Sequence, residues 1–316
     1  MRIVFFGTPE IAAPSLAALA AAYDVVAAVC QPDRPQGRGR KLKAPPAKAW
    51  AEANGIPVVQ PTKLNDGAFE AWLREQRPDL CAVAAYGRLL KQPLLDVPPL
   101  GWLNMHPSLL PRYRGPSPIQ SAILNGDEVT GVTIMRVSLE MDAGDILLQE
   151  EMPIRPDDTA ATLSERLAER GAHLLVQGVG LVARGEAVFT PQDEARAVYC
   201  RLFEKRDGLI DWTQPARRVH NLVRAAQPWP AAHTPFQGEP LRILQTEPLD
   251  AADAGAPGEV TAVDAEGFVV RAGEGAVRVL RVQPAGKRGM SAAEFVRGRR
   301  LTPGMRFGDD SAAGAP

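Results

Sequence analysis

Residues 104–145 read NMHPSLLPRYRGPSPIQSAILNGDEVTGVTIMRVSLEMDAGD, and they begin inside an apolar segment, 100–105, that is typical of a short β-strand. Side chains two apart in a strand leave it on the same face, so Asn104 and His106 should project together. Pro107 then ends the strand. Ligands of open parallel sheets bind beyond the carboxyl ends of the strands. We therefore predict an α/β fold with Asn104 and His106 at the edge where ligands bind.

A second strand and a turn lie later in the same stretch. Residues 132–137 alternate like a strand and lead into a turn, 140–145, that contains Asp142 and Asp145. One of these carboxylates is expected to reach His106. An amide, an imidazole and a carboxylate suit acyl transfer, because the reaction needs a donor for the oxyanion and a carrier for the proton of the amine. Taken singly, these residues are also compatible with a structural loop histidine and a turn former.

The combined pattern is more specific than its parts. Asn104, His106, the SLLP run at 108–111 and the DAGD turn at 142–145 together resemble the signature of the folate-dependent formyltransferases. The resemblance implies that Asn104 donates a hydrogen bond to the oxyanion, that His106 carries the proton and that Asp142 orients the imidazole. It also implies 10-formyltetrahydrofolate as the formyl donor, and no metal.

Two further segments are expected to line the folate site. The first is a rigid turn made of Ser108, Leu109, Leu110 and Pro111. The second follows the strand predicted at 80–84, where the resemblance implies that the pterin ring binds, and its candidates are Arg88 and Leu90. Helix capping and core packing are the alternative roles for this pair, and core packing is preferred for Leu90.

Residues 31–46 form a basic segment after the strand predicted at 25–29. Its basic residues are Arg34, Arg38, Arg40, Lys41 and Lys43, against the single acidic Asp33, and its Pro and Gly residues exclude helix and strand. The segment leaves the sheet on the side where Asn104 is expected. It resembles the basic insertion of those formyltransferases that act on initiator tRNA, and Arg38 matches the arginine most closely tied to tRNA binding. A solvated loop is the alternative.

Composition and charge exclude several other classes of protein. The formal net charge of −1 argues against a general nucleic-acid coat but allows local basic patches. The three cysteines, Cys30, Cys81 and Cys200, lack paired spacing, so neither a disulfide framework nor a zinc site is expected. The amino-terminal residues lack the pattern of a signal peptide, and no apolar run approaches membrane-spanning length. A cytoplasmic protein without a membrane partner is therefore expected.

The order of the patterns predicts two domains, as the length of 316 residues also suggests. Strands and helices alternate through 1–190, which predicts a doubly wound, mostly parallel Rossmann-like sheet with a long helix at 160–183. A looser segment, 191–207, is read as a linker. Short strands with Gly and Pro between them predict a smaller β-barrel domain of the oligonucleotide-binding type at 208–308, followed by a tail at 309–316. Its candidates for a phosphate-facing patch are Lys287, Arg288, Arg297, Arg299, Arg300 and Arg306.

The resemblance covers nearly the whole chain and implies a function. It implies an enzyme that transfers a formyl group from 10-formyltetrahydrofolate to the α-amine of methionyl initiator tRNA, for translation initiation. A monomer is expected, although the sequence does not give the oligomeric state. A sugar-nucleotide formyltransferase is the first alternative, although the basic segment would then be unexplained. A noncatalytic RNA-binding protein is the second. Dinucleotide binding is disfavoured, because Gly7 lacks Gly partners at the required spacing. Whether His106 acts as a neutral base or as a protonated donor stays open.

Overall fold

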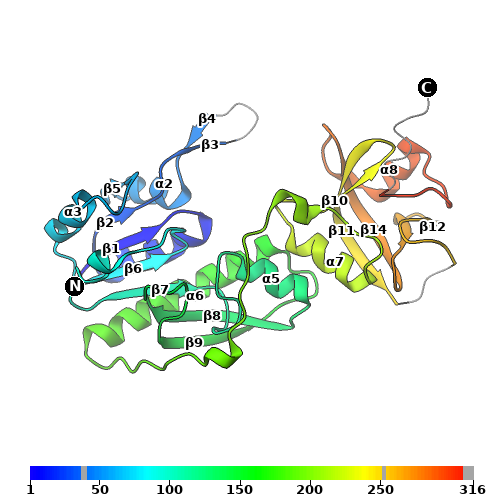
Figure 1. The fold of residues 1–316 in the computed structure, drawn as a ribbon. Coiled ribbons are helices and arrows are strands. Elements are labelled where there is room, and N and C mark those ends of the chain that lie inside the picture. Colours follow the sequence, from blue (N-terminus) through cyan, green and yellow to red (C-terminus); the bar gives the residue numbers. More distant parts are fainter. Residues whose placement is uncertain (37–40, 251–253, 309–316) are drawn as a thin grey trace. The chain divides into compact units, whose positions relative to one another are not determined.

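The computed structural model describes residues 1–36, 41–250 and 254–308 (Figure 1). The chain forms two compact units. The first consists of Met1–Pro118, Val129–Pro153 and Ser164–Arg201, and the second of Ile119–Glu128, Ile154–Leu163 and Leu202–Pro316. The predicted tail, 309–316, lies outside the described residues. Within the described ranges, no helix combines the length and the apolar composition that a membrane span requires.

The first unit is built on one seven-stranded sheet. Its strands, in spatial order, are β5 (Val58–Val59), β2 (Asp24–Val29), β1 (Arg2–Gly7), β6 (Leu80–Ala84), β7 (Trp102–His106), β8 (Val129–Arg136) and β9 (Ile146–Pro153). The strands from β5 to β7 run parallel, and β8 and β9 are antiparallel to their neighbours. The predicted Rossmann-like, mostly parallel sheet is therefore confirmed.

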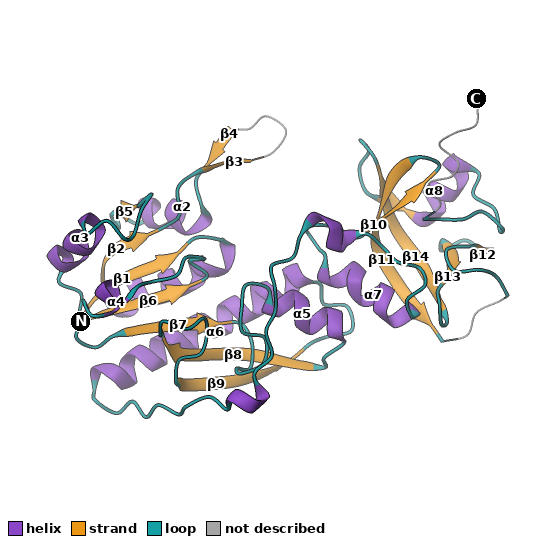
Figure 2. Ribbon diagram, viewed as in Figure 1, coloured by secondary structure: helices purple, strands orange, loops and turns teal. Residues whose placement is uncertain are grey.

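Helices cover both faces of this sheet (Figure 2). They are η1 (Glu10–Ala12), α1 (Ala13–Ala22), α2 (Pro46–Ala53), α3 (Ala68–Gln76), α4 (Gln92–Leu95) and α6 (Ala160–Ala183). Met105 of β7 lies against α6 at Gly171, where a Cβ would come within 2.8 Å of Met105 Cγ. On the opposite face, Phe6 and Trp102 pack with ring centroids 4.7 Å apart, in a core shared with α3 and α4. Because strand side chains alternate, Asn104 and His106 share the face of Trp102.

The basic segment departs from its prediction. The structure places a short antiparallel hairpin there, formed by β3 (Arg34–Gln36) and β4 (Lys41–Lys43). The expectation that Pro and Gly exclude a strand was wrong, because each strand of a two-stranded hairpin is an edge strand, where a missing N–H such as that of Pro35 is tolerated. Arg38 and Arg40 lie outside the described residues.

The second unit is built on a curled antiparallel sheet, as predicted for a barrel-like domain. Its strands, in order, are β10 (His233–Phe236), β11 (Glu239–Leu249), β14 (Ala276–Pro284), β13 (Phe268–Arg271) and β12 (Val260–Val263), and β15 (Met290–Ser291) pairs with β14. The short helices η3 (Lys205–Gly208), α7 (Ala216–Ala225) and α8 (Ala292–Arg299) belong to it. Trp212, Val223, Ile243, Phe268 and Phe295 are among the residues of its core.

Helix α7 connects the separate chain segments of this unit. Arg218 Nη1 donates to the carbonyl oxygen of Leu124, at 2.5 Å, near the end of α5 (Pro118–Asn125). Arg224 Nη1 donates to the carbonyl oxygen of Asp158 at 3.1 Å. Segments 119–128 and 154–163 therefore belong with the carboxy-terminal residues, although they are distant in sequence.

Candidate active site

His106 is the last residue of β7 and is 4% exposed. Its Nε2 lies 2.9 Å from the carbonyl oxygen of Tyr113. A carbonyl oxygen can only accept, so Nε2 must carry a proton in this arrangement. The other nitrogen, Nδ1, lies 3.7 Å from Asp142 Oδ2. The imidazole is therefore held from one side by a backbone group and faces a carboxylate on the other.

Of the two aspartates in the turn, Asp142 is the one that faces His106. Its Oδ2 accepts a hydrogen bond of 2.8 Å from the backbone N–H of Gly115. The Asp142 backbone is left-handed, with φ at 52°. Two residues later, a Cβ at Gly144 would lie 1.8 Å from the carbonyl oxygen of Arg136, so only glycine fits the close approach of the turn to β8. The structure thus brings the carboxylate and the imidazole together, and their catalytic role stays a prediction.

Asn104 lies one strand pleat before His106 on the same face of β7. Its backbone pairs with Val83 of β6 and Met135 of β8, which fixes it between two neighbours in the sheet. The side chain is half-buried and has no hydrogen-bond partner among the residues that the structure describes. Its amide is therefore available to donate to a substrate oxygen, as the predicted role requires.

The SLLP turn is held rigidly by side chains of the sheet. Thr133 Oγ1 donates to the carbonyl oxygen of Ser108 at 2.7 Å, and Gln149 Nε2 donates to that of Leu110 at 2.9 Å. Ser108 Oγ is itself used inside the turn, donating to the carbonyl oxygen of Arg112 at 2.6 Å. Ser108, Leu110 and Pro111 are buried, and Leu109 is partly exposed. Their contact with folate stays a prediction.

The segment after β6 divides into structural and exposed residues. The Arg88 guanidinium donates to the carbonyl oxygens of Pro61 and Thr62, at 2.9 and 3.0 Å. Leu90 is 8% exposed and packs in the core, the role preferred for it above. Leu89, which the sequence reasoning passed over, is 70% exposed and is a large apolar side chain of this segment that a ligand can reach. The sequence carried no signal that distinguishes the two adjacent leucines.

The hairpin of the basic segment is anchored at its base by polar side chains. Asp33 accepts hydrogen bonds from Gln60 Nε2 at 2.7 Å and from Lys48 Nζ at 2.9 Å. These contacts, that of Gln60 first, lower the pKa of Asp33. Burial raises the pKa of the neighbouring Cys30 thiol to about 12. The one acidic residue of the segment is thus already engaged at the base of the hairpin.

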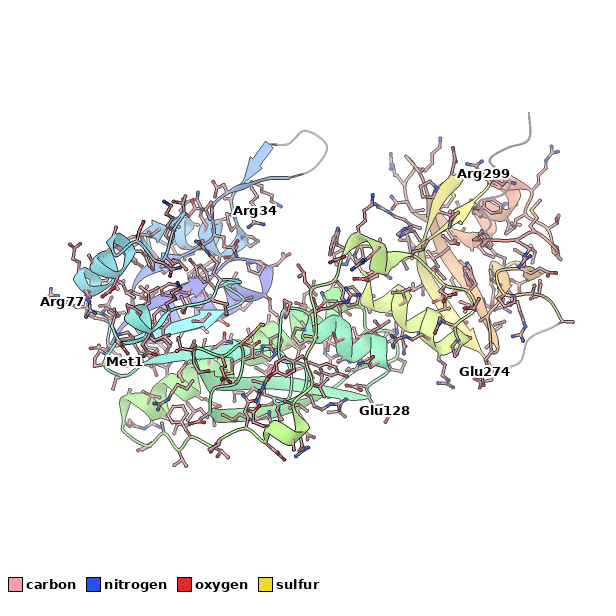
Figure 3. All side chains as sticks on the ribbon, in the orientation of Figure 1. Met1, Arg34, Arg77, Glu128, Glu274 and Arg299 are labelled. Atoms are coloured by element: carbon pink, nitrogen blue, oxygen red, sulfur yellow. The ribbon has the colours of Figure 1, made fainter. Side chains whose placement is uncertain are left out.

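Two cations of the hairpin, Arg34 and Lys43, are exposed to solvent. Arg34 and Lys43 are opposite each other in the β3–β4 pair, and both are exposed. Arg34, labelled in Figure 3, donates to Gln31 Oε1 at 2.8 Å. Lys41 is the first residue of β4. Arg34 and Lys43 are placed to meet an anionic partner, and the contact of the basic segment with tRNA stays a prediction.

Sequence reasoning missed a group of residues that holds the catalytic loops in place. Arg114 is fully buried, and its Nε donates to Gln192 Oε1 at 3.0 Å, while Gln192 Nε2 reaches the backbone of the Asp142 turn. These residues are 78 positions apart. Neither has a local sequence pattern that could have revealed the contact. Within the described ranges, no cluster of three or more His, Cys, Asp or Glu side chains is arranged to hold a metal ion.

Comparison with known proteins agrees with this arrangement. The family model described as formyl transferase matches residues 1–179, and that described as formyl transferase, C-terminal domain, matches 203–300. A methionyl-tRNA formyltransferase of Moorella thermoacetica is 46% identical over 309 residues, 98% of this chain and 99% of its own. One from Roseiflexus sp. (strain RS-1) is 47% identical over 314 residues, 99% of this chain and 97% of its own.

A solved structure shares the fold. The crystal structure of HypX from Aquifex aeolicus in complex with tetrahydrofolic acid aligns with 94% of this chain and 47% of its own, with a TM-score of 0.62 and 21% identity. At that identity the likeness is one of fold.

Proposed function

The chain belongs to the formyl transferase family, and we propose that it transfers a formyl group from 10-formyltetrahydrofolate to the α-amine of methionyl initiator tRNA. One observation carries the proposal. Relatives that are 46 and 47% identical over nearly their whole length are methionyl-tRNA formyltransferases. This similarity includes both the catalytic unit and the barrel-like unit, and it does not favour a sugar-nucleotide acceptor or a noncatalytic RNA-binding protein.

The side chains of the site supply what the reaction needs. The amine attacks the formyl carbon, the bond from that carbon to the donor nitrogen breaks, and the amine loses a proton while the donor nitrogen gains one. We infer that Asn104 donates to the oxygen on which negative charge develops, because its amide has no partner among the described side chains. The backbone of β7 holds this donor in place before the substrates arrive.

His106 is proposed as the proton carrier. Its Nε2 is committed to the carbonyl of Tyr113, so Nδ1 is the nitrogen at which a proton can be taken up. Asp142 Oδ2, 3.7 Å away, then stabilises the positive charge on the ring. The carboxylate also accepts the N–H of Gly115, which holds it in this orientation.

Folate is proposed to bind beyond the ends of β6 and β7. The turn at 108–111 and the segment at 85–90 border this edge, and they offer backbone groups together with the exposed side chain of Leu89. Arg88 and Leu90 support the shape of the segment from behind through the contacts described above. No metal is required for the proton transfers proposed here.

The acceptor is tested by one direct assay. Purified protein is incubated with 10-formyltetrahydrofolate and methionyl initiator tRNA, and in parallel with an amino-sugar nucleotide. Formylation of the tRNA alone is expected. Formylation of the sugar nucleotide alone would replace the proposed acceptor, and formylation of neither would remove the proposed activity.

The basic hairpin is proposed to contact tRNA phosphates through Arg34, Arg38, Arg40, Lys41 and Lys43. Arg38→Ala should weaken tRNA binding and lower the slope of log K against log salt concentration by about 0.7–0.9, the value for one phosphate contact. The affinity for folate should not change. Arg74→Ala is the matched control, because Arg74 is an exposed arginine of α3 that pairs with Glu70. Equal salt slopes for Arg38→Ala and wild type would leave the hairpin without a role in tRNA binding.

A further inference from the structure

The chain that leaves α6 returns along the catalytic loops. We call residues 189–200 the clamp segment. Thr190 exchanges two backbone hydrogen bonds with Ile146, at 2.8 and 2.9 Å, at the edge strand β9. Further on, Val198 N–H donates to the carbonyl oxygen of Pro111 at 3.0 Å. The clamp segment is thus attached to both sides of the site, at β9 and at the turn after β7, and it lies within the first unit.

Arg114 is the centre of the contacts between the clamp segment and the site. Its side chain is fully buried, and its guanidinium donates to both carboxylate oxygens of Glu194, at 2.9 and 2.6 Å. It also donates to Tyr199 Oη at 3.1 Å and, through Nε, to Gln192 Oε1 at 3.0 Å. The hydrogen bonds from Arg114, and then its charge, lower the pKa of Glu194. An arginine cannot discharge when it is buried, so these acceptors hold the guanidinium in one geometry.

Gln192 connects Arg114 to the Asp142 turn through hydrogen bonds. The guanidinium has donors only, so the Gln192 oxygen must face it and the amide cannot flip. The amide NH₂ is then directed at the turn, where it donates to the carbonyl oxygens of Asp142 and Gly144, both at 2.8 Å. Gln192 therefore holds the backbone on either side of Ala143.

The Asp142 turn needs such support. A left-handed backbone at a residue other than glycine is unfavourable and persists only when its surroundings hold it. If the two bonds from Gln192 are lost, Asp142 can relax, and its carboxylate then moves away from His106 Nδ1. Arg114 also follows directly after Tyr113, whose carbonyl oxygen accepts the bond from His106 Nε2. One buried guanidinium therefore fixes the groups on both sides of the imidazole.

We propose that Arg114 and Gln192 are positioning residues of the active site, which hold the Tyr113 carbonyl and the Asp142 carboxylate in place around His106. The inference rests on the proposed formyl transfer for its kinetic test. It also predicts a change at His106 itself that can be measured without turnover.

The first test removes the two donors of Gln192 together with the oxygen that accepts from Arg114. Gln192→Met has a similar length and no N–H groups, and kcat should fall by about 10- to 100-fold, the range expected when a catalytic group is misplaced by about 1 Å. The KM for 10-formyltetrahydrofolate should stay the same. Gln227→Met is the matched control, because Gln227 Nε2 likewise donates to two carbonyl oxygens, those of Val223 and Leu244, but in the second unit. This control should retain the wild-type kcat.

A double-mutant cycle separates positioning from a general loss of structure. In an Asp142→Ala background, Gln192→Met should cause a smaller fold-loss of kcat than in the wild type, because the carboxylate that it positions is gone and only the lost contact with Arg114 still acts. If the two losses multiply, or if Gln192→Met alone keeps the wild-type kcat, Gln192 does not act through Asp142. Should Gln192→Met fail to fold, Gln192→Glu serves in its place, because it keeps the contact with Arg114 and removes both donors.

The second test is spectroscopic and does not depend on the substrate. With isotopically labelled histidine, the imidazole nitrogen signals of His106 should shift in Gln192→Met and stay unchanged in Gln227→Met. Unchanged His106 signals in Gln192→Met would overturn the positioning role even if the enzyme proved inactive. An inactive wild type with shifted signals in Gln192→Met would instead contradict the proposed function and leave the positioning role standing.

Discussion

Two histidines of this chain are removed from solvent in different surroundings. His106 lies at the end of β7, bonded to the Tyr113 carbonyl and facing Asp142. His220 lies in α7, where its Nδ1 is 3.0 Å from Thr246 Oγ1 of β11. Its charged neighbours are cationic. Burial first, and then the charge of Arg224, lowers the pKa of His220 to about 4.

The comparison shows that burial alone does not prepare a histidine for proton transfer. His220 stays neutral at physiological pH, because burial and the adjacent arginines oppose its positive charge. It connects α7 to β11. At His106 a carboxylate faces the ring, and Asn104 on the same strand leaves its amide without a partner among the described side chains. His106 is buried and His220 is partly buried, and what further distinguishes them is the charge beside each ring and the polar groups left open around it.

The largest effect is expected at the first of these histidines. His106→Ala and Asp142→Ala should each lower kcat by about 10²- to 10⁴-fold, the usual contribution of a positioned acid or base, while the chain still folds. His220→Asn, measured at pH 7 in the same assay, should keep the wild-type kcat. If His220→Asn lowers kcat as much as His106→Ala does, the proposed difference between the two sites is wrong.

Asn104 should give the next largest effect. Asn104→Ala removes the proposed oxyanion donor and should lower kcat by about 10²- to 10³-fold, as the loss of such a donor does in other enzymes. Stability should hardly change, since no internal hydrogen bond is broken. The measurement is kcat together with the urea midpoint. A stable variant with unchanged kcat would assign Asn104 to the sheet and not to the reaction.

Local sequence patterns predicted most of what surrounds His106. The strand at 80–84 and the helix at 160–183 have the predicted bounds in the structure. The strand predicted at 100–105 occupies 102–106. These elements have periodic apolar residues and clear end signals, and such signals are contained in the element itself. The placement of Asn104 and His106 on one face follows from the same alternation, and the turn after β8 was expected to bring one of its two aspartates to His106.

The groups that hold the site in place could not be predicted in this way. The acceptor for His106 Nε2 is a backbone carbonyl, which every residue possesses and no motif marks. The contact from Arg114 to Gln192 joins two residues that are 78 positions apart, and the Gln192 segment had no periodic pattern. Arg88 was assigned to the folate site, yet its donors reach two carbonyls whose position depends on how a distant loop folds back. Long-range polar contacts of this kind depend on the tertiary fold.

The pH dependence of folding stability tests the surroundings proposed for His220. Its folded pKa is about 4, below the ordinary value of 6.5, so the unfolded chain binds more protons between these values. Folding stability is therefore lost as pH falls from about 6.5 to about 4. Below pH 4, His220 causes no further loss. The loss should be about 2–3 kcal/mol, allowing for partial solvent screening of the ring.

Urea unfolding at pH 7, 5.5 and 4.5 measures this loss. His220→Asn should flatten the dependence, whereas His173→Asn, which replaces an exposed histidine of α6, should leave it as in the wild type. The same slope in His220→Asn and wild type would show that other groups dominate the acid response.

The smallest effect is expected from the hydrogen-bond partner of His220. Thr246→Val keeps the shape of a buried, β-branched side chain in β11 and removes the hydroxyl that meets Nδ1, so the second unit should lose about 1 kcal/mol of stability at pH 7. The chain provides a matched control in Thr261 of β12, whose buried Oγ1 has no hydrogen-bond partner among the described residues. Thr261→Val should be neutral or stabilising, because burying an unpaired hydroxyl is unfavourable. If both variants shift the urea midpoint equally, the loss reflects the change of side chain and not the bond, and His220 would then connect α7 to β11 by packing alone.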